Sequence, residues 1–286
     1  MQEIKRINER FWYQTPVSLT DRPIIAAVVG NERTLMIDAG NSEAHAKSFL
    51  SELQIRKLRA PSLLVITHWH WDHIFGMSAL DMPSISTSET KREIQKLLPY
   101  SWSDQALEDR VKNGLEIEFC AAAIKEEFGQ QRNIKIQLPT ISFEGEMAIE
   151  LGGVTCLVKH VGGDHSADSL IIYIKEEKIL FLADCVYADI FAPATNYTIK
   201  NVVTLLDIIE TFDAEFYVLS HEEVKTKKEF DEEIKILKKA AHLTEAHHGG
   251  ISSMADAYET ELGRPLNEDE YEMLVYFSNG YGIQSK

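Results

Sequence analysis

Histidines and an aspartate follow directly after a short apolar run in one segment of the chain. Residues 67–73 read THWHWDH, and the apolar run LLVI occupies residues 63–66. The apolar run predicts a buried strand, which places the polar segment in the loop at the end of that strand. Neutral imidazoles and carboxylates are good ligands for zinc and similar divalent ions, so the segment predicts a metal site. The alternative is a histidine-rich surface loop, which does not account for the further candidate ligands downstream.

The candidate ligands within this segment are His68, His70, Asp72 and His73. In an extended chain alternate side chains point to the same side, so His68 and His70 are expected to face one side together. Asp72 and His73 follow where the chain turns. A cluster of this kind is able to serve two adjacent metal ions.

Further candidate ligands lie beside other predicted strands. His165 is in the turn GGDHSADS at residues 162–169, although a lone histidine in a turn is more often solvated. Asp184 follows the apolar run LFLA, and His221 follows the run FYVLS. A carboxylate after an apolar strand is costly unless it is paired or bound to metal, so Asp184 is either a bridge between two cations or a helix or turn cap. The repeated order of strand and then ligand places all candidates at one edge of the predicted sheets.

Residues next to these ligands each admit a functional and a structural interpretation. His160 lies at the end of a predicted strand, where it supports a ligand, contacts substrate, or is a partly buried structural histidine. Trp69 and Trp71 alternate with the ligands and either wall an apolar substrate pocket or pack beneath the loop. Cys185 is expected to be a buried residue beside the bridging position and not a ligand.

The charge and the cysteines narrow the range of partners. The formal net charge is −16, whereas nucleic-acid-binding proteins usually carry a basic surface, so no nucleic-acid partner is expected. The cysteines are odd in number and show no paired spacing, which indicates a reducing compartment. No run of about 18 apolar residues is present to span a membrane, and residues 1–16 lack a signal-peptide core. We therefore expect a cytoplasmic protein with a small-molecule substrate.

Strand and helix patterns alternate along the chain and indicate an α/β fold. We expect strands at residues 24–29, 34–37, 63–67, 134–138, 141–143, 147–151, 154–159, 169–174, 179–182 and 216–219. We expect helices from the N-cap Ser42 to about residue 56, twice within 89–129, and at 199–212, 225–246, 251–262 and 267–278. Strands flanked by helices on both sides predict a two-sheet core between helical layers.

The domain organisation follows from the absence of a clear linker. Residues 1–286 are predicted to form one domain with two helical additions. The helices within about 89–129 form an insertion, which is either a lid over the site or an ordinary outer-layer helix pair. Residues from about 225 to 286 form a helical tail that either packs on its own domain or provides a homodimer contact.

The ordered ligand set resembles that of the metallo-β-lactamase superfamily over about residues 24–222. The residues Asp38-Ala39-Gly40 also match an early aspartate-x-glycine turn of that family. The resemblance implies a four-layer αββα sandwich and a dinuclear metal centre, in which Asp38 orients a ligand histidine. By this resemblance the metal ligands are His68, His70 and His165 for one ion, Asp72, His73 and His221 for the other, and Asp184 as the bridge.

The resemblance also implies a metal-dependent hydrolase. Two neighbouring divalent ions lower the pKa of a bridging water, and the resulting hydroxide attacks a small ester, lactone, thioester or phosphodiester. Zinc suits these ligands, with manganese or iron as alternatives, and Asp72 is expected to accept or relay a proton. True metallo-β-lactamases lack an aspartate at the position of Asp184, and flavin-partnered diiron members carry glutamate at that of His70. The alternatives are an iron-dependent oxidoreductase with the same dinuclear site and a non-catalytic metal-binding protein.

Tyr187 follows Asp184 by three residues. In this respect the chain is similar to the acyl-homoserine-lactone hydrolases of the superfamily, which carry a tyrosine at that spacing. The similarity implies that the phenol contacts the substrate carbonyl as an oxyanion donor. The alternative is a tyrosine packed against the helix layer. Asp72 and Tyr187 are therefore the candidate catalytic residues.

Overall fold

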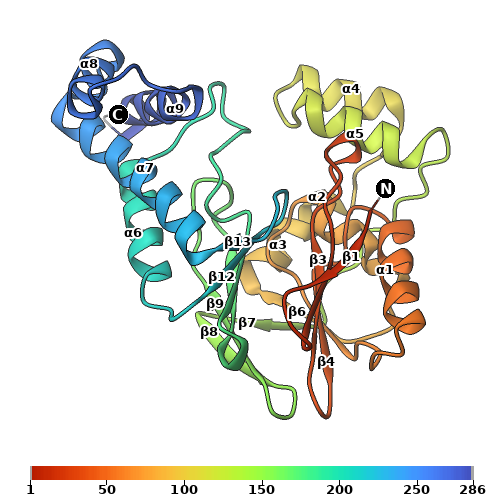
Figure 1. Cartoon of the computed structure of the whole chain (residues 1–286). Helices are drawn as coiled ribbons and strands as arrows, with labels where there is room; N and C mark the ends of the chain where they lie inside the picture. Colours follow the sequence, from red (N-terminus) through yellow and green to blue (C-terminus); the bar gives the residue numbers. More distant parts are fainter. Residues whose placement is uncertain (1, 285–286) are drawn as a thin grey trace.

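Two β-sheets lie at the centre of the structure, a computed structural model that describes residues 2–284 (Figure 1). The first sheet has the strand order β1 (Ile4–Arg6), β2 (Phe11–Gln14), β3 (Ile25–Val29), β4 (Thr34–Ile37), β5 (Leu63–Val65), β6 (Ser84–Thr87) and β7 (Ile141–Phe143). The second sheet has the order β13 (Lys225–Thr226), β12 (Phe216–Leu219), β11 (Ile179–Ala183), β10 (Leu170–Ile174), β9 (Thr155–His160) and β8 (Glu146–Glu150). Strands β4 to β7 run parallel, as do β11 and β12.

Helices cover the outer face of each sheet and extend beyond one edge. The α-helices are α1 (Glu43–Ile55), α2 (Trp71–Ile74), α3 (Ser88–Leu97), α4 (Asp104–Lys112), α5 (Glu118–Phe128), α6 (Ile199–Ile209), α7 (Lys227–Ala246), α8 (Ile251–Leu262) and α9 (Glu268–Gln284). Short 3-10 helices are η1 (Ser18–Thr20), η2 (Phe75–Ala79) and η3 (Lys175–Glu177). In Figure 1 the yellow helices α4 and α5 and the blue helices α7 to α9 lie on opposite sides of the molecule.

Alternating side chains along the strands build the layers. In β3, Ile25 packs towards α1, while its neighbour Ala26 packs between the sheets. In β11, Leu180 packs towards α6 and α7, while Phe181 packs between the sheets. This alternation follows from the pleat of a strand, which sends successive side chains to opposite faces. Both sheets are thus buried on two faces, and the predicted four-layer αββα sandwich is confirmed.

One predicted strand is wrong, and four strands were missed. Residues 134–138 form no strand, and the following Pro139 has no N–H to donate to a ladder. The alternating Ile134, Ile136 and Leu138 nevertheless pack against the hydrophobic core beside the first sheet. Their alternating pattern therefore predicted correctly that these side chains are buried, but it predicted wrongly that the backbone pairs with a neighbouring strand. The missed strands β1 and β2 add an antiparallel edge to the first sheet. Strand β6, beside β5, and the two-residue β13, where a helix was predicted to begin, were missed as well.

The insertion contains three helices in the described chain, where the sequence predicted two. Helix α3 ends before Pro99, and Ser103 then caps α4 by accepting a hydrogen bond from the Ala106 N–H. Gly114, with a φ of 67°, follows α4 and allows the chain to turn before α5. The short α4 was merged with α5 because apolar residues recur at helical spacing across the turn.

The helical tail forms close to where it was predicted. Asn267 accepts from the Glu270 N–H at 2.8 Å, and the Glu270 carboxylate accepts from the Asn267 N–H at 2.9 Å, which is a capping box at the start of α9. Helix α9 runs beyond the predicted residue 278, and Gly280 lets it approach the Tyr197 carbonyl, because a Cβ there would lie 1.9 Å from that oxygen.

Between residues 2 and 284, no helix has the length and apolar character needed to cross a membrane.

Gly76 holds the polar loop against the turn at residues 38–40. Its N–H donates to the Gly40 carbonyl at 3.0 Å, and the Ala39 N–H donates to the His73 carbonyl at 2.9 Å. A Cβ on Gly76 would lie 2.0 Å from the Ala39 carbonyl oxygen, so backbone must move. We expect Gly76→Ala to lower the free energy of unfolding by about 1–3 kcal/mol in a urea titration.

Gly282 is the matched control because it lies in α9, where a Cβ would meet no atom of residues 2–284 within 4 Å. Gly282→Ala should leave the free energy of unfolding unchanged or raise it slightly, since alanine favours a helix. If Gly76→Ala is as stable as Gly282→Ala, the close approach between the polar loop and the turn is incorrect.

Candidate metal centre

The predicted ligands meet at one edge of the two sheets. Strand β5 leads into the loop that carries His68 and His70, and the turn before β10 carries His165. Strands β11 and β12 end just before Asp184 and His221. The ends of strands from both sheets therefore bring together residues that are up to 153 positions apart in the chain (68 to 221).

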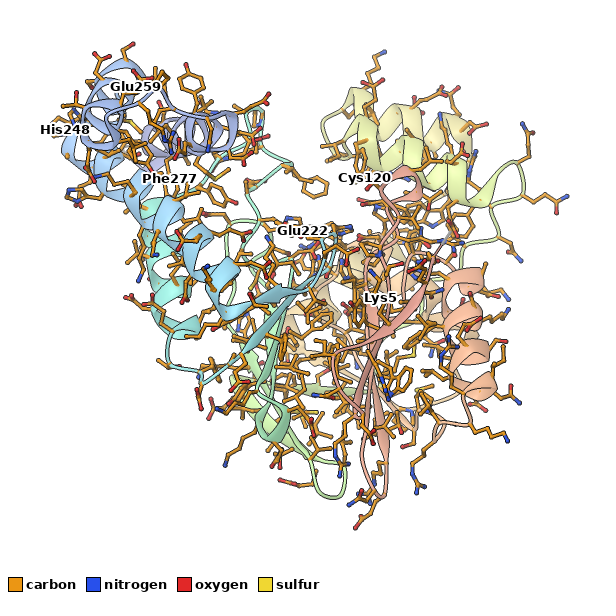
Figure 2. All side chains as sticks on the ribbon, in the orientation of Figure 1. Lys5, Cys120, Glu222, His248, Glu259 and Phe277 are labelled. Atoms are coloured by element: carbon orange, nitrogen blue, oxygen red, sulfur yellow. The ribbon has the colours of Figure 1, made fainter. Side chains whose placement is uncertain are left out.

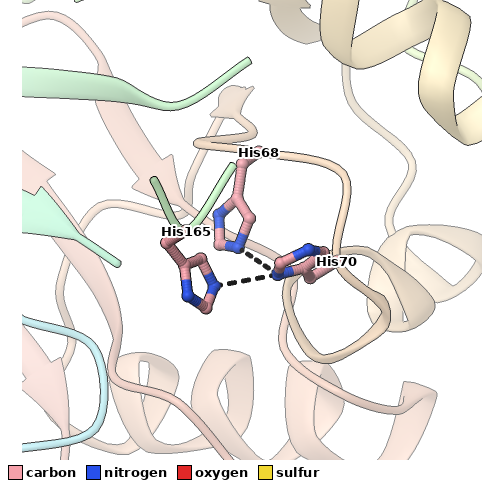
Figure 3. A group of neighbouring side chains, drawn as sticks. All are labelled: His68, His70 and His165. Atoms are coloured by element: carbon pink, nitrogen blue, oxygen red, sulfur yellow. Dashed lines mark hydrogen bonds between the residues drawn. The ribbon is translucent and has the colours of Figure 1, made fainter. Parts of the chain in front are cut away.

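Three histidines form the first ligand group (Figure 3). The Nδ1 atom of His70 lies 3.1 Å from Nε2 of His68 and 2.9 Å from Nε2 of His165. All three side chains are buried. Burial lowers the pKa of each imidazole, and neighbouring imidazoles lower it further. The histidines are thus held neutral, which is the form that binds a metal ion.

Neighbouring oxygens fix the outer sides of two of these rings. The Thr67 hydroxyl lies 3.1 Å from Nδ1 of His68, and the Ala188 carbonyl lies 3.3 Å from Nδ1 of His165. Each contact leaves the Nε2 atom of its ring facing the centre of the group. Such contacts select the tautomer and the orientation that a metal ligand requires.

The second group contains Asp72, His73, Asp184 and His221. Its candidate ligand atoms lie within 4.8 Å of one another, as do those of the first group. Oδ2 of Asp72 is 3.0 Å from Nε2 of His73 and 3.3 Å from Nε2 of His221. The resemblance assigned the non-bridging residues of this group to the second ion, and the structure places them together.

Asp184 lies between the two groups. Its Oδ2 atom is 3.8 Å from Nε2 of His68 and 3.4 Å from Nε2 of His165 in the first group. The same atom is 3.3 Å from Nε2 of both His73 and His221 in the second group. One carboxylate oxygen is therefore within 4 Å of imidazole nitrogens from both sites.

The chain turns sharply as it delivers Asp184. The register between β11 and β12 shifts between Phe181 and Ala183, and Ala183 has a φ of 48°. Alanine rarely adopts this left-handed conformation, which costs of the order of 1–3 kcal/mol. The surrounding strands must therefore impose it, and the result is a carboxylate aimed at the ligand groups instead of a continued strand.

Asp38 supports the ligand loop from inside the fold. Its Oδ2 atom is 2.8 Å from Nδ1 of His73, and it accepts a hydrogen bond from the Thr67 hydroxyl at 2.8 Å. Its Oδ1 atom accepts from the Thr67 N–H at 2.8 Å. Nε2 of His73 consequently faces the second group. The predicted orienting contact of Asp38 with a ligand histidine is present in the structure.

Asp21 is a member of the site that sequence reasoning missed. It follows η1 with a φ of 51°, and its Oδ1 atom lies 3.5 Å from Nδ1 of His221. Burial raises the pKa of Asp21 to about 7, and the charge of Asp72 adds to the rise. The segment around Asp21 has no periodic pattern or apolar strand before it, so nothing local marked it as a ligand neighbour.

Several buried atoms of the site fit a divalent ion. Oδ2 of Asp72, Nε2 of His73 and Oδ1 of Asp184 are buried and have no hydrogen-bond partner among the described residues. Buried polar atoms without partners are costly, and a cation between them removes that cost. Burial alone would raise the pKa of both carboxyls, but the adjacent imidazoles, above all that of His73, hold it well below its usual range. The donor set therefore suits the ions that the resemblance implies.

The structure shows where the residues next to the candidate ligands lie, for which the sequence left a functional and a structural interpretation open. His160 belongs to neither ligand group, because its Nε2 lies 2.8 Å from the Ala167 carbonyl and helps to fix the turn before β10. Cys185 is buried, and burial raises the pKa of its thiol. Trp71 lines the cavity above the metal centre. Trp69 instead contacts the edge of the His70 ring and lines a neighbouring cavity.

The cavity above the ligands has a volume of about 280 Å³, and we call it the metal cavity. Phe119 and Cys120 of α5 line it, so the insertion forms part of its wall. Tyr187 lines it too, with its hydroxyl 3.4 Å from the His221 N–H. Burial raises the pKa of Tyr187 well above its usual value, and Asp184 raises it further, so the phenol keeps its proton. Phe191 adds an apolar wall.

The chain is similar in sequence and in fold to known proteins. The chain is 27% identical over 192 residues to the acyl-coenzyme A thioesterase MBLAC2 of Homo sapiens, a match that covers 63% of this chain. The chain spans 62% of the length of that relative and of its Bos taurus counterpart. The fold is similar to a metallo-beta-lactamase from Pontibacter korlensis, with a TM-score of 0.57, 18% identity, and coverage of 82% of this chain and 98% of that chain.

The chain is also similar to a second solved structure and matches a family model. FIM-1 from Pseudomonas aeruginosa, in its mono-zinc form, gives a TM-score of 0.58 at 13% identity, covering 84% of this chain and 96% of that chain. The family model of the metallo-beta-lactamase superfamily matches residues 21–221, a span that contains both ligand groups. With the sandwich, the ligand order and this match in agreement, the chain belongs to the metallo-beta-lactamase superfamily.

Proposed function

We propose that this protein is a hydrolase that holds two divalent ions, with zinc as the first candidate, and cleaves a small ester-like substrate. The position of Asp184 carries the proposal, because its Oδ2 lies within 4 Å of imidazole nitrogens from both ligand groups. A structural zinc site closes with four ligands, whereas two adjacent groups that share a carboxylate suit a catalytic pair of ions. When bound, such a pair activates water and polarises the substrate oxygen.

The chain's own residues would orient the substrate and move protons. Asp72 stays ionised at neutral pH because its pKa lies well below its usual range, so it would accept a hydrogen bond from the attacking water and relay its proton instead of retaining it. Tyr187 accepts a hydrogen bond from the His221 N–H and donates its hydroxyl proton to the Glu222 carboxylate, so this proton would turn from Glu222 to a substrate oxygen. The apolar walls of the metal cavity exclude water from the rest of the substrate.

Among ester-like substrates, a thioester, carboxylic ester or lactone leads, and a phosphodiester follows. The similarity to a relative named as an acyl-coenzyme A thioesterase supports a thioester substrate. Neither a serine nor a cysteine nucleophile is required. Cys120 and Cys185, which lie at or beside the metal cavity, are buried thiols whose pKa is raised, so neither is activated as a thiolate.

Tyr187→Phe tests the phenol as a donor to the substrate. We expect kcat to fall about 10–100-fold, because one hydrogen bond to the developing oxyanion is lost, while KM changes little. Metal content and stability should stay at wild-type values, since the ring still packs in place. Steady-state kinetics and elemental analysis measure these quantities. An unchanged kcat would assign Tyr187 to packing alone.

A hydrolysis panel tests the proposed function as a whole. Zinc-loaded protein should hydrolyse at least one of a lactone, a thioester, a carboxylic ester, a phosphodiester and a β-lactam. Asp184→Ala at the same concentration controls for contaminating hydrolases. If the wild-type protein has both ions by elemental analysis and turns over none of these compounds, the proposed function is wrong.

A further inference from the structure

A second cavity adjoins the metal cavity, and we call it the tail cleft. Its volume is about 490 Å³, and Tyr187 and Ile190 line both cavities. The remaining walls come from the loop at residues 186–197, the segment at residues 219–225, the first half of α7, and one face of α9. A substrate whose reacting bond lies beside Tyr187 therefore has room for a second group beyond that tyrosine.

The tail cleft combines apolar walls with an excess of carboxylates. Val186, Leu237 and Met273 supply apolar surface. The charged side chains that line it are Glu222, Lys225, Glu233, Asp269 and Glu272. Figure 2 shows Glu222 below the tail helices, on the side facing the centre of the molecule. The lining thus contains four carboxylates and one ammonium group.

Two of these carboxylates lack a cationic partner. Lys225 forms ion pairs with both Glu222 and Glu233, so its charge is already neutralised. Glu272 accepts a hydrogen bond from the Tyr276 hydroxyl at 2.7 Å, which orients it without neutralising it. Among the described residues, neither Asp269 nor Glu272 has a lysine or arginine nitrogen within 4 Å. The tail cleft therefore has a net negative potential.

Apart from the metal ions themselves, little positive charge is available beside the substrate. Among residues 2–284, neither lysine nor arginine lines the metal cavity. A third cavity beside His70 contains Lys96, but that ammonium group pairs with Glu93 at 2.6 Å. Phosphate recognition normally uses unpaired lysine or arginine side chains, or helix N-termini. A thioester whose thiol part carries several phosphates would meet only negative or neutral surface here.

Building on the proposed function, we propose that the tail cleft binds a positively charged, amphipathic end of the substrate. An ammonium group placed near Asp269 and Glu272 is attracted by two unpaired carboxylates, and the adjoining carbons pack on Met273 and Leu237. The ester or thioester bond then lies beside Tyr187. The preferred substrate class is thus a cationic ester or thioester, and not the polyanionic thioester of coenzyme A.

Binding of two amphiphiles of equal chain length and opposite charge tests this assignment without turnover. We expect octyltrimethylammonium to bind zinc-loaded protein at least about tenfold more tightly than octyl sulfate in calorimetry. Glu272→Lys should reduce this preference by about tenfold or more. Glu272→Gln retains an acceptor for Tyr276 and should reduce the preference by a smaller factor, which guards against a folding defect in the lysine variant.

Asp256→Lys is the matched control, because Asp256 is exposed on α8, outside the tail cleft, and the change in net charge is the same. It should leave the preference within about twofold of wild type, since solvent and salt screen an exposed charge that does not line the cleft. Equal binding of both amphiphiles, or equal effects of Glu272→Lys and Asp256→Lys, would overturn the assignment.

Turnover separates this inference from the function on which it rests. Wild-type protein should hydrolyse octanoylthiocholine with a higher kcat/KM than octanoyl-coenzyme A, and Glu272→Lys should shift the ratio towards the latter. A wild-type preference for the coenzyme A thioester rejects the cationic substrate class but leaves the hydrolase proposal standing. If neither thioester is turned over, both compounds are excluded as substrates. If the hydrolysis panel is negative as well, the hydrolase proposal is rejected. The charge preference of the tail cleft is then decided by the amphiphile binding data.

Discussion

Asp184→Ala is expected to abolish most of the activity and to remove at least one of two metal ions. The substitution deletes the oxygen that lies within 4 Å of imidazole nitrogens in both ligand groups. We expect kcat/KM to fall by at least about a thousandfold, which corresponds to about 4 kcal/mol. Metal content should fall from two ions per chain to one or none. Steady-state kinetics and elemental analysis of the dialysed variant measure both changes.

The fold should survive this substitution, because the sheets and their core do not depend on Asp184. Burying a charged carboxylate costs free energy because the charge loses its hydration. Removing the carboxylate removes this cost, which offsets part of the lost attraction to the imidazoles. Asp256→Ala, on the exposed face of α8, is the control and should retain both ions and full activity. An Asp184→Ala variant with two ions and wild-type turnover would show that this residue does not bridge a catalytic pair.

Asp38→Ala is expected to have the second-largest effect, acting on stability and metal affinity together. Asp38 is fully buried and accepts hydrogen bonds from the Thr67 N–H and hydroxyl while contacting the His73 ring at 2.8 Å. Its loss leaves buried donors without partners, at about 1–3 kcal/mol for each group. We expect the free energy of unfolding to fall by about 3 kcal/mol or more. Zinc affinity should fall about 10–100-fold.

Asp38→Asn distinguishes the charge from the hydrogen bonds. Asparagine tolerates the φ of 58° found at this position and still accepts one bond from Thr67. It should therefore recover much of the stability but little of the zinc affinity, because a neutral amide orients His73 less strongly than a carboxylate does. Urea unfolding and zinc titration measure the two effects separately. Wild-type zinc affinity in both variants would rule out a supporting role for Asp38 at the metal centre.

Most of the candidate ligands could be predicted because they follow a pattern of local sequence. Asp184 and His221 come directly after buried strands, and the loop with His68 and His70 follows β5. Strand ends in a sandwich of sheets meet at a common edge, so local patterns were enough to predict a shared location. A turn histidine alone gives no such signal, so His165 was proposed as a ligand because it complements the cluster at residues 68–73, and the family resemblance assigned it to the first ion.

The remaining features depend on long-range packing. Asp21 approaches His221 only because η1 lies under the site, and Ala183 adopts a φ of 48° only because the neighbouring strands impose it. The alternation of Ile134, Ile136 and Leu138 predicts a strand equally well, although in the fold these side chains pack from a loop. The tail cleft combines α7, α9 and the loop at 186–197, whose relative placement no local pattern indicates.

A crystal structure of the zinc-loaded protein, with anomalous data collected at the zinc edge, would locate the metal ions directly. We expect two anomalous peaks about 3.5–4 Å apart, as in other two-metal sites. One peak should lie among His68, His70 and His165, the other beside Asp72, His73 and His221, with Asp184 between them. A single peak, or peaks outside these two groups, would show that the protein does not hold the proposed pair of ions.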